Sequence, residues 1–359
     1  MSKPIVIALD AMGGDHGPSV IVPAALNALH LYPQLHIILV GIESVIHEQL
    51  LKHHGVNLPR LSVVHASQTV SMDEKPSSAL RLKKDSSMRI AINLVKSGSA
   101  QACVSAGNTG ALMATAKFVL KTLPGIDRPA IMAKLPTMRP HALVRVLDLG
   151  ANVDSTPQNL LDFALMGSIV AKEVGGIPAP TVGLLNVGEE EMKGNELVKQ
   201  TALLLESYPG IHYIGFVEGD DVFKGTADVV ICDGFVGNVM LKATEGVVKL
   251  ISSAIKKAFL KNWFTKLSAL AVLHILKKIG KSFDPGQFNG ASFLGLNGIV
   301  IKSHGGANQA AFENAIREAM EEVEQDVPAK IRSQLAMLIA AQPELVISPL
   351  AGAIFDETH

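Results

Sequence analysis

Residues 5–18 read Ile-Val-Ile-Ala-Leu-Asp-Ala-Met-Gly-Gly-Asp-His-Gly-Pro, and this stretch decides the fold class. Its first residues are apolar and rich in β-branched side chains as far as Asp10, which is typical of a buried strand. Gly13 and Gly14 then indicate a tight turn, and Pro18 suits the first turn of a helix. The stretch therefore predicts a β-strand, a polar turn and an α-helix in succession.

The same order of apolar run, polar loop and helix-like segment recurs along the chain. It begins again at residues 102–105, 144–148, 182–185, 229–233 and 299–302. Parallel strands joined by helices are covered on both faces and carry ligand sites at their carboxyl ends. We therefore expect an α/β/α sandwich with a mainly parallel sheet, whose polar loops lie at one edge and form one site.

Composition bounds the class of protein. The 359 residues are 48% hydrophobic and 18% charged, which is ample for a large buried core. A net charge of -1 argues against a nucleic-acid-binding domain, because such domains are usually strongly basic. A chain of this length suggests about two domains or one large α/β unit, which we expect over residues 1–330, with a C-terminal extension over 331–359.

Cysteine usage and hydropathy indicate a cytoplasmic protein. Cys103 and Cys232 lie in apolar runs, as buried free thiols in a reducing compartment do. The apolar run that ends at Asp10 is too short for a signal peptide, and no run of about eighteen apolar residues marks a membrane span.

A lysine-rich segment stands apart from the rest of the chain. Residues 246–283 contain no Asp or Glu and alternate lysines with apolar side chains, which predicts a basic amphipathic helical hairpin at about 246–284. It could dock an acidic protein, lie on an anionic membrane surface, or pack against another subunit. The candidate docking residues are Lys256, Lys257, Lys261, Trp263, Phe264, Lys266, Lys277 and Lys278.

The polar loops suit a bound anion. Glycine lets the backbone approach a ligand closely, and helix N-termini supply unpaired N–H groups. The loops match no dinucleotide fingerprint and no P-loop. Strand-end aspartates such as Asp10 could orient a donor, bind a metal or cap a helix. His16, His304 and Lys302 could balance phosphate charge or move a proton, although a structural histidine is the alternative.

Residues 74–88 place basic and hydroxyl side chains before a helix. Arg81 offers bidentate donors, and Ser86 and Ser87 offer hydroxyl groups near a helix start, which together suit an oxyanion. A solvated surface run is the alternative.

Four motifs, at residues 9–18, 105–111, 233–238 and 302–305, together resemble the bacterial phosphate acyltransferases of phospholipid synthesis. The resemblance implies conversion of long-chain acyl-(acyl carrier protein) and inorganic phosphate into acyl phosphate, which feeds a membrane glycerol-3-phosphate acyltransferase. It also implies a homodimer, no cofactor and no metal. The implied fold is similar to phosphotransacetylases and isocitrate/isopropylmalate dehydrogenases, with two lobes around a cleft.

The resemblance further implies that the loop residues of these four motifs form the active site, and our own interpretation of residues 74–88 and of the loop after residues 144–148 adds further residues to it. Those placed in catalysis are Asp10, His16, Asn108, Asn238, Lys302 and His304. Those placed in substrate binding are Gly13, Gly14, Asp15, Arg81, Ser86, Ser87, Gly107, Thr109, Asp148, Asn152, Asp233 and Gly234. Glycine amides would cradle phosphate, and the asparagine amides would donate to the thioester oxygen as charge develops there.

Two other functions remain open at this point. A nicotinamide-dependent decarboxylating dehydrogenase could use the same fold, although the dinucleotide fingerprint is missing. A non-enzymatic scaffold could recruit a carrier protein through the lysine-rich segment. Because the cysteines are expected to be buried within strands, we expect phosphate to attack the thioester directly, without an acyl-enzyme.

Overall fold

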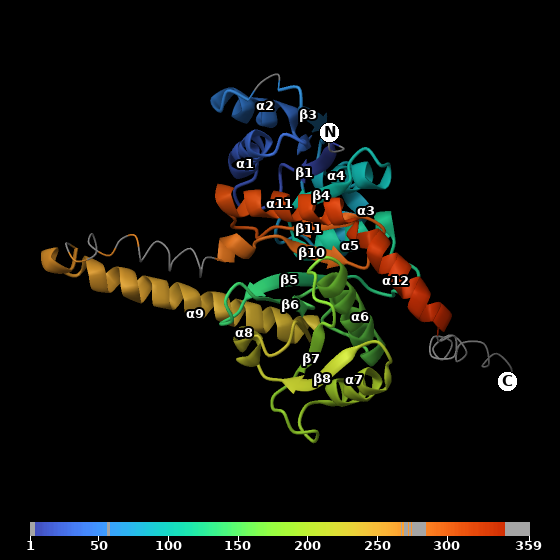
Figure 1. Cartoon of the computed structure of the whole chain (residues 1–359). Helices are drawn as coiled ribbons and strands as arrows, with labels where there is room; N and C mark the ends of the chain where they lie inside the picture. The colour runs from blue at the N-terminus through green and yellow to red at the C-terminus, as the bar shows by residue number, and fades with distance from the viewer. Residues whose placement is uncertain are drawn as a thin grey trace.

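The computed structural model describes residues 4–55, 58–266, 268, 272, 274 and 285–341. One sheet runs through the protein, with helices on both of its faces (Figure 1). Its strands are β1 (Ile5–Asp10), β2 (Leu35–Gly41), β3 (Leu61–His65), β4 (Ala102–Ser105), β5 (Ala130–Pro136), β6 (Leu143–Leu147), β7 (Thr181–Leu185), β8 (His212–Val217), β9 (Val229–Ile231), β10 (Ala291–Leu294) and β11 (Ile299–Lys302). The helices are α1 (Pro18–Leu31), α2 (Glu43–Lys52), α3 (Pro76–Leu82), α4 (Ser87–Lys96), α5 (Thr109–Leu120), α6 (Pro157–Glu173), α7 (Glu196–Ser207), α8 (Asp221–Lys224), α9 (Gly234–Leu260), η1 (Pro285–Phe288), α11 (Gln309–Gln325) and α12 (Val327–Ala341).

Several elements begin at the residues that the sequence predicts. Strands β1, β4 and β11 have the predicted bounds, and helix α1 starts at Pro18. Helix α6 starts at Pro157 behind a capping box, in which the Thr156 hydroxyl accepts from the Asn159 N–H and the Asn159 amide accepts from the Thr156 N–H. Such a cap satisfies N–H groups that have no intrahelical partner.

The sheet has the order β3-β2-β1-β4-β11-β10-β5-β6-β9-β7-β8. Seven of its ten pairings are parallel, which confirms a mainly parallel sheet. The three antiparallel pairings follow one another, from β11 to β10, β10 to β5 and β5 to β6. Three reversals leave β6, β9, β7 and β8 running opposite to β1, β4 and β11.

This reversal corrects the expectation that all polar loops share one edge. Ile301 lies level with Ser292, Ser292 with Met132, and Met132 with Leu147. From these paired residues β11 runs toward one edge of the sheet and β6 toward the opposite edge, so the loops that follow the two strands lie at opposite edges. The sequence pattern missed the cause, because β5 and β10 are not followed by the polar loop and helix that mark the other strands.

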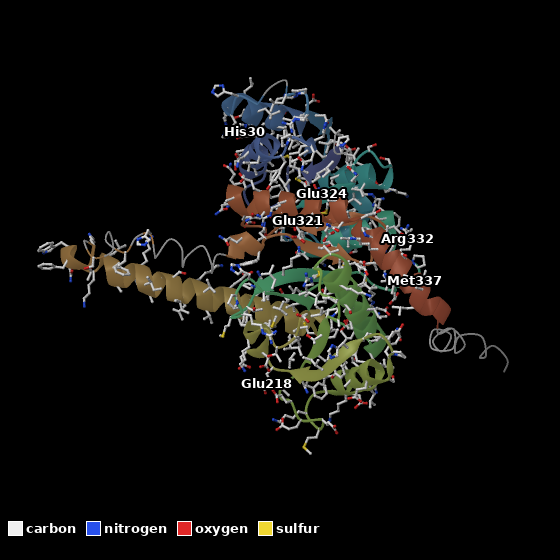
Figure 2. The ribbon with its side chains drawn as sticks, in the orientation of Figure 1. His30, Glu218, Glu321, Glu324, Arg332 and Met337 are labelled. Atoms are coloured by element: carbon white, nitrogen blue, oxygen red, sulfur yellow. The ribbon has the colours of Figure 1, made fainter. Side chains whose placement is uncertain are left out.

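The core lies on both faces of the sheet. Helices α1 and α11 pack on the face that carries Ile7 and Leu9 of β1, whereas α4 and α5 pack on the opposite face. In the second half of the sheet, α6, α7 and α12 cover Leu147 and Val182. The predicted start of the C-terminal extension, residue 331, lies inside α12. Arg332 of α12, labelled in Figure 2, donates to Asn297 Oδ1 at 3.0 Å.

Helix α9 projects away from the body of the protein (Figure 1). Of its 27 residues only Gly234 and Gly237 are buried. Its second half is the first arm of the predicted basic hairpin, within a helix that starts at residue 234 rather than about 246. The chain turns after Leu260 and is helical again from Trp263, whose ring stacks on Phe264 at 3.5 Å between centroids. Lys277 and Lys278 lie outside the described residues.

Candidate active site

The turns after β1, β4 and β11 pack together at one edge of the sheet. These strands are adjacent and parallel, and the Asp15 N–H donates to the Gly305 carbonyl at 2.9 Å. A Cβ atom on Gly13 would lie 2.8 Å from the Gly107 nitrogen, and one on Gly14 would lie 2.8 Å from the Gly305 oxygen. Gly14 also has a φ of +82°. The three turns therefore touch backbone to backbone, which only glycine permits.

Asp10 is buried beneath these turns, with 1% of its surface exposed. Its Oδ2 accepts from the Ser105 hydroxyl at 2.6 Å, and that hydroxyl oxygen accepts from the Gly107 N–H at 3.1 Å. Its Oδ1 has no hydrogen-bond partner within the described part of the chain. Burial raises the pKa of Asp10, although Ser105 and Ser87 act in the opposite direction. Asp10 thus braces the Gly107 turn through Ser105, a residue that the sequence motif contained but that we did not predict as part of the site.

Lys302, the last residue of β11, places an ammonium group beside the same turns. Its Nζ donates to the Ala106 carbonyl at 3.4 Å and to the Ser303 carbonyl. None of the ion pairs among the described residues involves Lys302. Burial, followed by the charge of Lys242, lowers its pKa to about 8. A part-buried cation without a carboxylate partner is a site that an anion would stabilise.

His304 lies between these turns and helix α9. Its Nδ1 accepts from the Gly306 N–H at 3.0 Å, so a neutral ring carries its proton on Nε2. Nε2 lies 4.0 Å from Glu245 of α9, which in turn pairs with Lys242 at 3.0 Å. Burial and Lys242 lower the pKa of His304, and Glu245 opposes them. Sequence reasoning missed Glu245, since nothing local connects a mid-helix glutamate with a turn about sixty residues later.

Two predicted donors have their polar groups occupied. The Asn108 Oδ1 caps α5 by accepting from the Ala111 N–H at 2.9 Å, and its Nδ2 donates to the Met72 carbonyl at 2.6 Å. The Ser86 hydroxyl caps α4 by accepting from the Arg89 N–H and donates to the Lys83 carbonyl at 2.7 Å. In this structure the Asn108 amide, predicted to donate to the thioester oxygen, and the Ser86 hydroxyl, predicted to bind an oxyanion, both cap helices instead, and their predicted roles stay predictions.

The other predicted residues of this half lie on the same turns, with one exception. Asp15 and His16 are exposed on the first turn, Thr109 begins α5, and Ser87 begins α4 beside Asp10. Arg81 is exposed in the last turn of α3. No hydrogen bond or ion pair between described residues joins Arg81 to the three turns.

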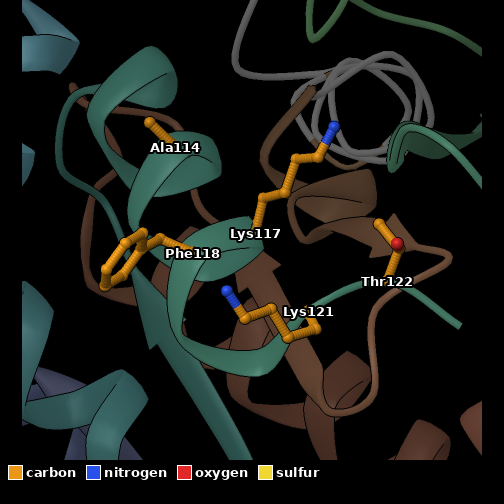
Figure 3. Close-up of a pocket in the computed structure, with 5 residues that line it drawn as sticks. All are labelled: Ala114, Lys117, Phe118, Lys121 and Thr122. Atoms are coloured by element: carbon orange, nitrogen blue, oxygen red, sulfur yellow. The ribbon is translucent and has the colours of Figure 1, made fainter.

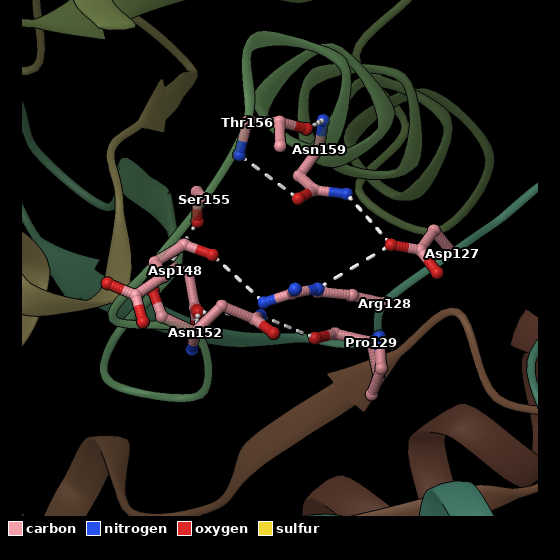
Figure 4. Close-up of polar contacts among 9 residues, drawn as sticks. Asp127, Arg128, Pro129, Asp148, Asn152, Ser155, Thr156 and Asn159 are labelled. Carbon is pink, nitrogen blue, oxygen red and sulfur yellow. Dashed lines mark hydrogen bonds and ion pairs between the residues drawn. The ribbon is translucent and has the colours of Figure 1, made fainter. Parts of the chain in front are cut away.

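A second set of predicted residues forms its own cluster after β6 and β9. Asp148 is fully buried, and its two oxygens accept from the N–H groups of Ile131, Ala151 and Asn152 and from the Asn152 side chain. The Asn152 amide also donates to the Pro129 carbonyl at 2.8 Å (Figure 4). Since these groups are all satisfied, Asp148 and Asn152 hold a turn together, and the prediction that they bind substrate is not supported.

Helix α9 begins against this second cluster. Asp233 caps it by accepting from the Phe235 and Val236 N–H groups, and the Gly234 N–H donates to the Asn152 carbonyl at 2.8 Å. Asn238 is exposed one turn later. The helix then reaches His304 through Glu245. The predicted single site is therefore two clusters, one on each half of the sheet, with α9 between them.

The comparisons with known proteins decide the family. The family model described as "Fatty acid synthesis protein" matches residues 5–330. The phosphate acyltransferase of Coxiella burnetii (strain Dugway 5J108-111) is 58% identical over 337 residues, which cover 93% of this chain and 97% of that protein. The phosphate acyltransferase of Legionella pneumophila (strain Paris) is 55% identical, with the same coverage. The chain belongs to the phosphate acyltransferase family.

A phosphate acyltransferase is an acyl-transferring enzyme whose reaction involves phosphate. This assignment is therefore evidence against both the dehydrogenase and the non-enzymatic scaffold. The fold agrees with it. A phosphotransacetylase from Streptococcus pyogenes has a TM-score of 0.62 at 18% identity, and the match covers 89% of this chain and 94% of that one.

No group of three or more His, Cys, Asp or Glu side chains among the described residues is arranged to hold a metal ion. No helix in the part of the chain that the structure describes is long and apolar enough to cross a membrane.

Proposed function

We propose that the chain transfers a long-chain acyl group from the thioester of an acyl carrier protein to inorganic phosphate, and that the acyl phosphate serves phospholipid synthesis. The observation that supports this most directly is the Lys302 ammonium, which lies beside three interlocked glycine turns without a carboxylate partner among the described residues. Phosphate has the charge and size that such a pocket would bind.

In the proposed reaction a phosphate oxygen attacks the carbonyl carbon of the thioester. The new C–O bond forms, the C–S bond breaks, and the carrier leaves as a thiolate that takes up a proton. Phosphate is already anionic at neutral pH, so its position matters more than its deprotonation. The glycine amides and Lys302 would hold it, and Lys302 can also supply the proton.

The cysteines support direct attack by phosphate. Cys103 and Cys232 are both buried, and burial raises the pKa of each thiol well above its usual value. A buried, protonated thiol is a poor nucleophile, so an acyl-enzyme on either cysteine is disfavoured.

The test is release of thiol from palmitoyl carrier protein as phosphate is added. We expect release to depend on phosphate, and Lys302→Met to lower kcat/KM by about 100-fold, the scale of losing one well-placed donor to a developing charge. Lys172→Met is the matched control, because Lys172 is an exposed lysine at the end of α6. Release that is independent of phosphate would contradict the proposal.

We also propose that α9 and the tip beyond it mediate assembly at the cytoplasmic face of the membrane. Leu250 is 69% exposed and Ile251 is 54% exposed on α9, which supports pairing with a second copy in a homodimer. Trp263 and Phe264 lie at the tip among exposed lysines, as expected of a contact with anionic lipid. There a membrane glycerol-3-phosphate acyltransferase would consume the product.

Vesicles of phosphatidylglycerol test the tip. Trp263→Ser with Phe264→Ser is expected to reduce cosedimentation with the vesicles and leave turnover of soluble substrate intact. Leu250→Glu with Ile251→Glu is expected to yield monomers in sedimentation velocity. Unchanged cosedimentation of the Trp263/Phe264 variant with vesicles would contradict the membrane contact. Dimers of the Leu250/Ile251 variant in sedimentation velocity would contradict the pairing through α9.

A further inference from the structure

The carboxyl-terminal end of α5 carries a group of cations around an exposed aromatic ring. Phe118 is 53% exposed. The Arg89 guanidinium lies 5.0 Å from the centroid of its ring, and the Lys121 amino group lies 4.9 Å from it. Lys117 and Lys121 line an open hollow of about 450 Å³ beside this ring (Figure 3). We call Arg89, Lys117, Phe118 and Lys121 the α5 basic cluster.

The cations of this cluster form no ion pair with an acidic residue in the part of the chain that the structure describes. None of the ion pairs within the described ranges involves Arg89, Lys117 or Lys121. Lys121 also has a φ of 63°, a conformation that favours glycine and costs free energy for a lysine. Arg89 and Lys121 lie over the Phe118 ring and, like Lys117, form no ion pair within the described ranges, so this surface carries positive charge that a negatively charged partner could neutralise.

The surrounding sequence strengthens the positive field. Between residues 75 and 126 the chain has Lys75, Arg81, Lys83, Lys84, Arg89, Lys96, Lys117 and Lys121 but only one acidic residue, Asp85. The Asp85 carboxylate already accepts from the Ser67 N–H and hydroxyl groups. These residues fold into α3, α4 and α5, which pack on one another. A chain with a net charge of -1 therefore concentrates positive charge on one part of its surface.

We propose that the α5 basic cluster is a docking surface for an acidic protein, and that this protein is the carrier of the acyl thioester. The inference rests on the proposed function. An open surface with an exposed aromatic ring and an arginine suits a macromolecular partner better than a small anion, which needs an enclosed pocket. Complementary charge would steer the encounter, and Phe118 would anchor it.

The position of the cluster fits delivery of a thioester to the candidate active site. Helix α5 begins at Thr109, next to the Gly107 turn, and ends at Leu120 beside the cluster. Its 12 residues span about 18 Å at the usual rise of an α-helix. A carrier docked on the cluster would therefore have to extend its acyl group across about that distance to reach the Gly107 turn.

The experiment compares two thioesters of the same acyl group, one on carrier protein and one on a small thiol, with phosphate as acceptor. For Lys117→Glu with Lys121→Glu we expect kcat/KM for the carrier substrate to fall about tenfold, mainly through KM, and the small thioester to be unaffected. Lys117→Arg with Lys121→Arg keeps the charge and is expected to keep the activity. Lys172→Glu with Lys199→Glu makes the same change in net charge on the other half of the sheet and is the control.

The outcomes separate this inference from the proposed function. Equal kcat/KM for carrier substrate in the Lys117/Lys121 reversal and in the control would overturn the docking surface. An equal fall of kcat/KM for both thioesters would also overturn it. So would a charge reversal that weakens only cosedimentation with phosphatidylglycerol vesicles, because the partner would then be a membrane. If the unmodified protein released no thiol from either substrate, the proposed function itself would fail.

Discussion

Replacing Lys302 by Met is expected to make the protein more stable and less active at once. Lys302 has a pKa of about 8 in the folded protein, against an ordinary value of 10.5, because burial and Lys242 disfavour its charge. At pH 7 the fall of this pKa from 10.5 to about 8 corresponds to about 3 kcal/mol of unfavourable free energy. Met has a similar length, carries no charge, and fits the same space.

The sign of the pH dependence follows from the direction of the shift. Below pH 8 the lysine is charged in both states, and the folded state bears the full cost. Between about 8 and 10.5 the unfolded chain binds more protons than the folded one, so this group's contribution to stability rises with pH. Urea unfolding at pH 7 is therefore expected to show the largest gain for Lys302→Met, and unfolding near pH 10 the smallest.

Phosphate provides the second readout. It should stabilise the natural protein in proportion to its binding and stabilise Lys302→Met much less. A variant that is less stable than the natural protein at pH 7 would refute the reasoning about the buried charge. Equal stabilisation of both proteins by phosphate would refute the assignment of Lys302 to the anion.

Three further predictions test the site. Gly14→Ala is expected to lose about 2–4 kcal/mol of stability in urea unfolding, because it adds contacts of 2.8 and 2.9 Å to an unfavourable φ, whereas Gly98→Ala, with φ +75° and nothing within 4 Å, should lose only about 1–2 kcal/mol; equal losses would contradict the backbone packing of the turns. Glu245→Gln is expected to lower the pKa of His304 further in an NMR titration, since it removes the negative charge that opposes burial and Lys242, and an unchanged or raised pKa would contradict this interaction. Cys103 is expected to react with a thiol reagent only after denaturation, and fast reaction of the folded protein would contradict its burial.

Local sequence was a good guide to the elements of the first half of the sheet. The runs at β1, β4 and β11 end in turns that sequence alone identified as polar and rich in glycine, and Asp10, Gly13, Gly14, Gly107, Lys302 and His304 are indeed neighbours. This worked because neighbouring parallel strands present their carboxyl ends at one edge, so a motif at each strand end implies proximity.

The sequence by itself therefore determined the α/β class and the glycine-rich turns at the strand ends, since each of these follows from short-range periodicity and backbone freedom. Only the tertiary structure decided how the two halves of the sheet are joined. The antiparallel pairings of β5 and β10 reverse the strand direction between the two halves, so Asp148, Asn152 and Asp233 lie in a separate cluster. There the carboxylates of Asp148 and Asp233 accept hydrogen bonds from backbone N–H groups. The tertiary structure also brought Glu245 to His304 and placed Arg89 and Lys121 over the ring of Phe118. Strand direction and contacts between distant residues depend on which strands pair, and pairing is decided by the packing of the whole chain.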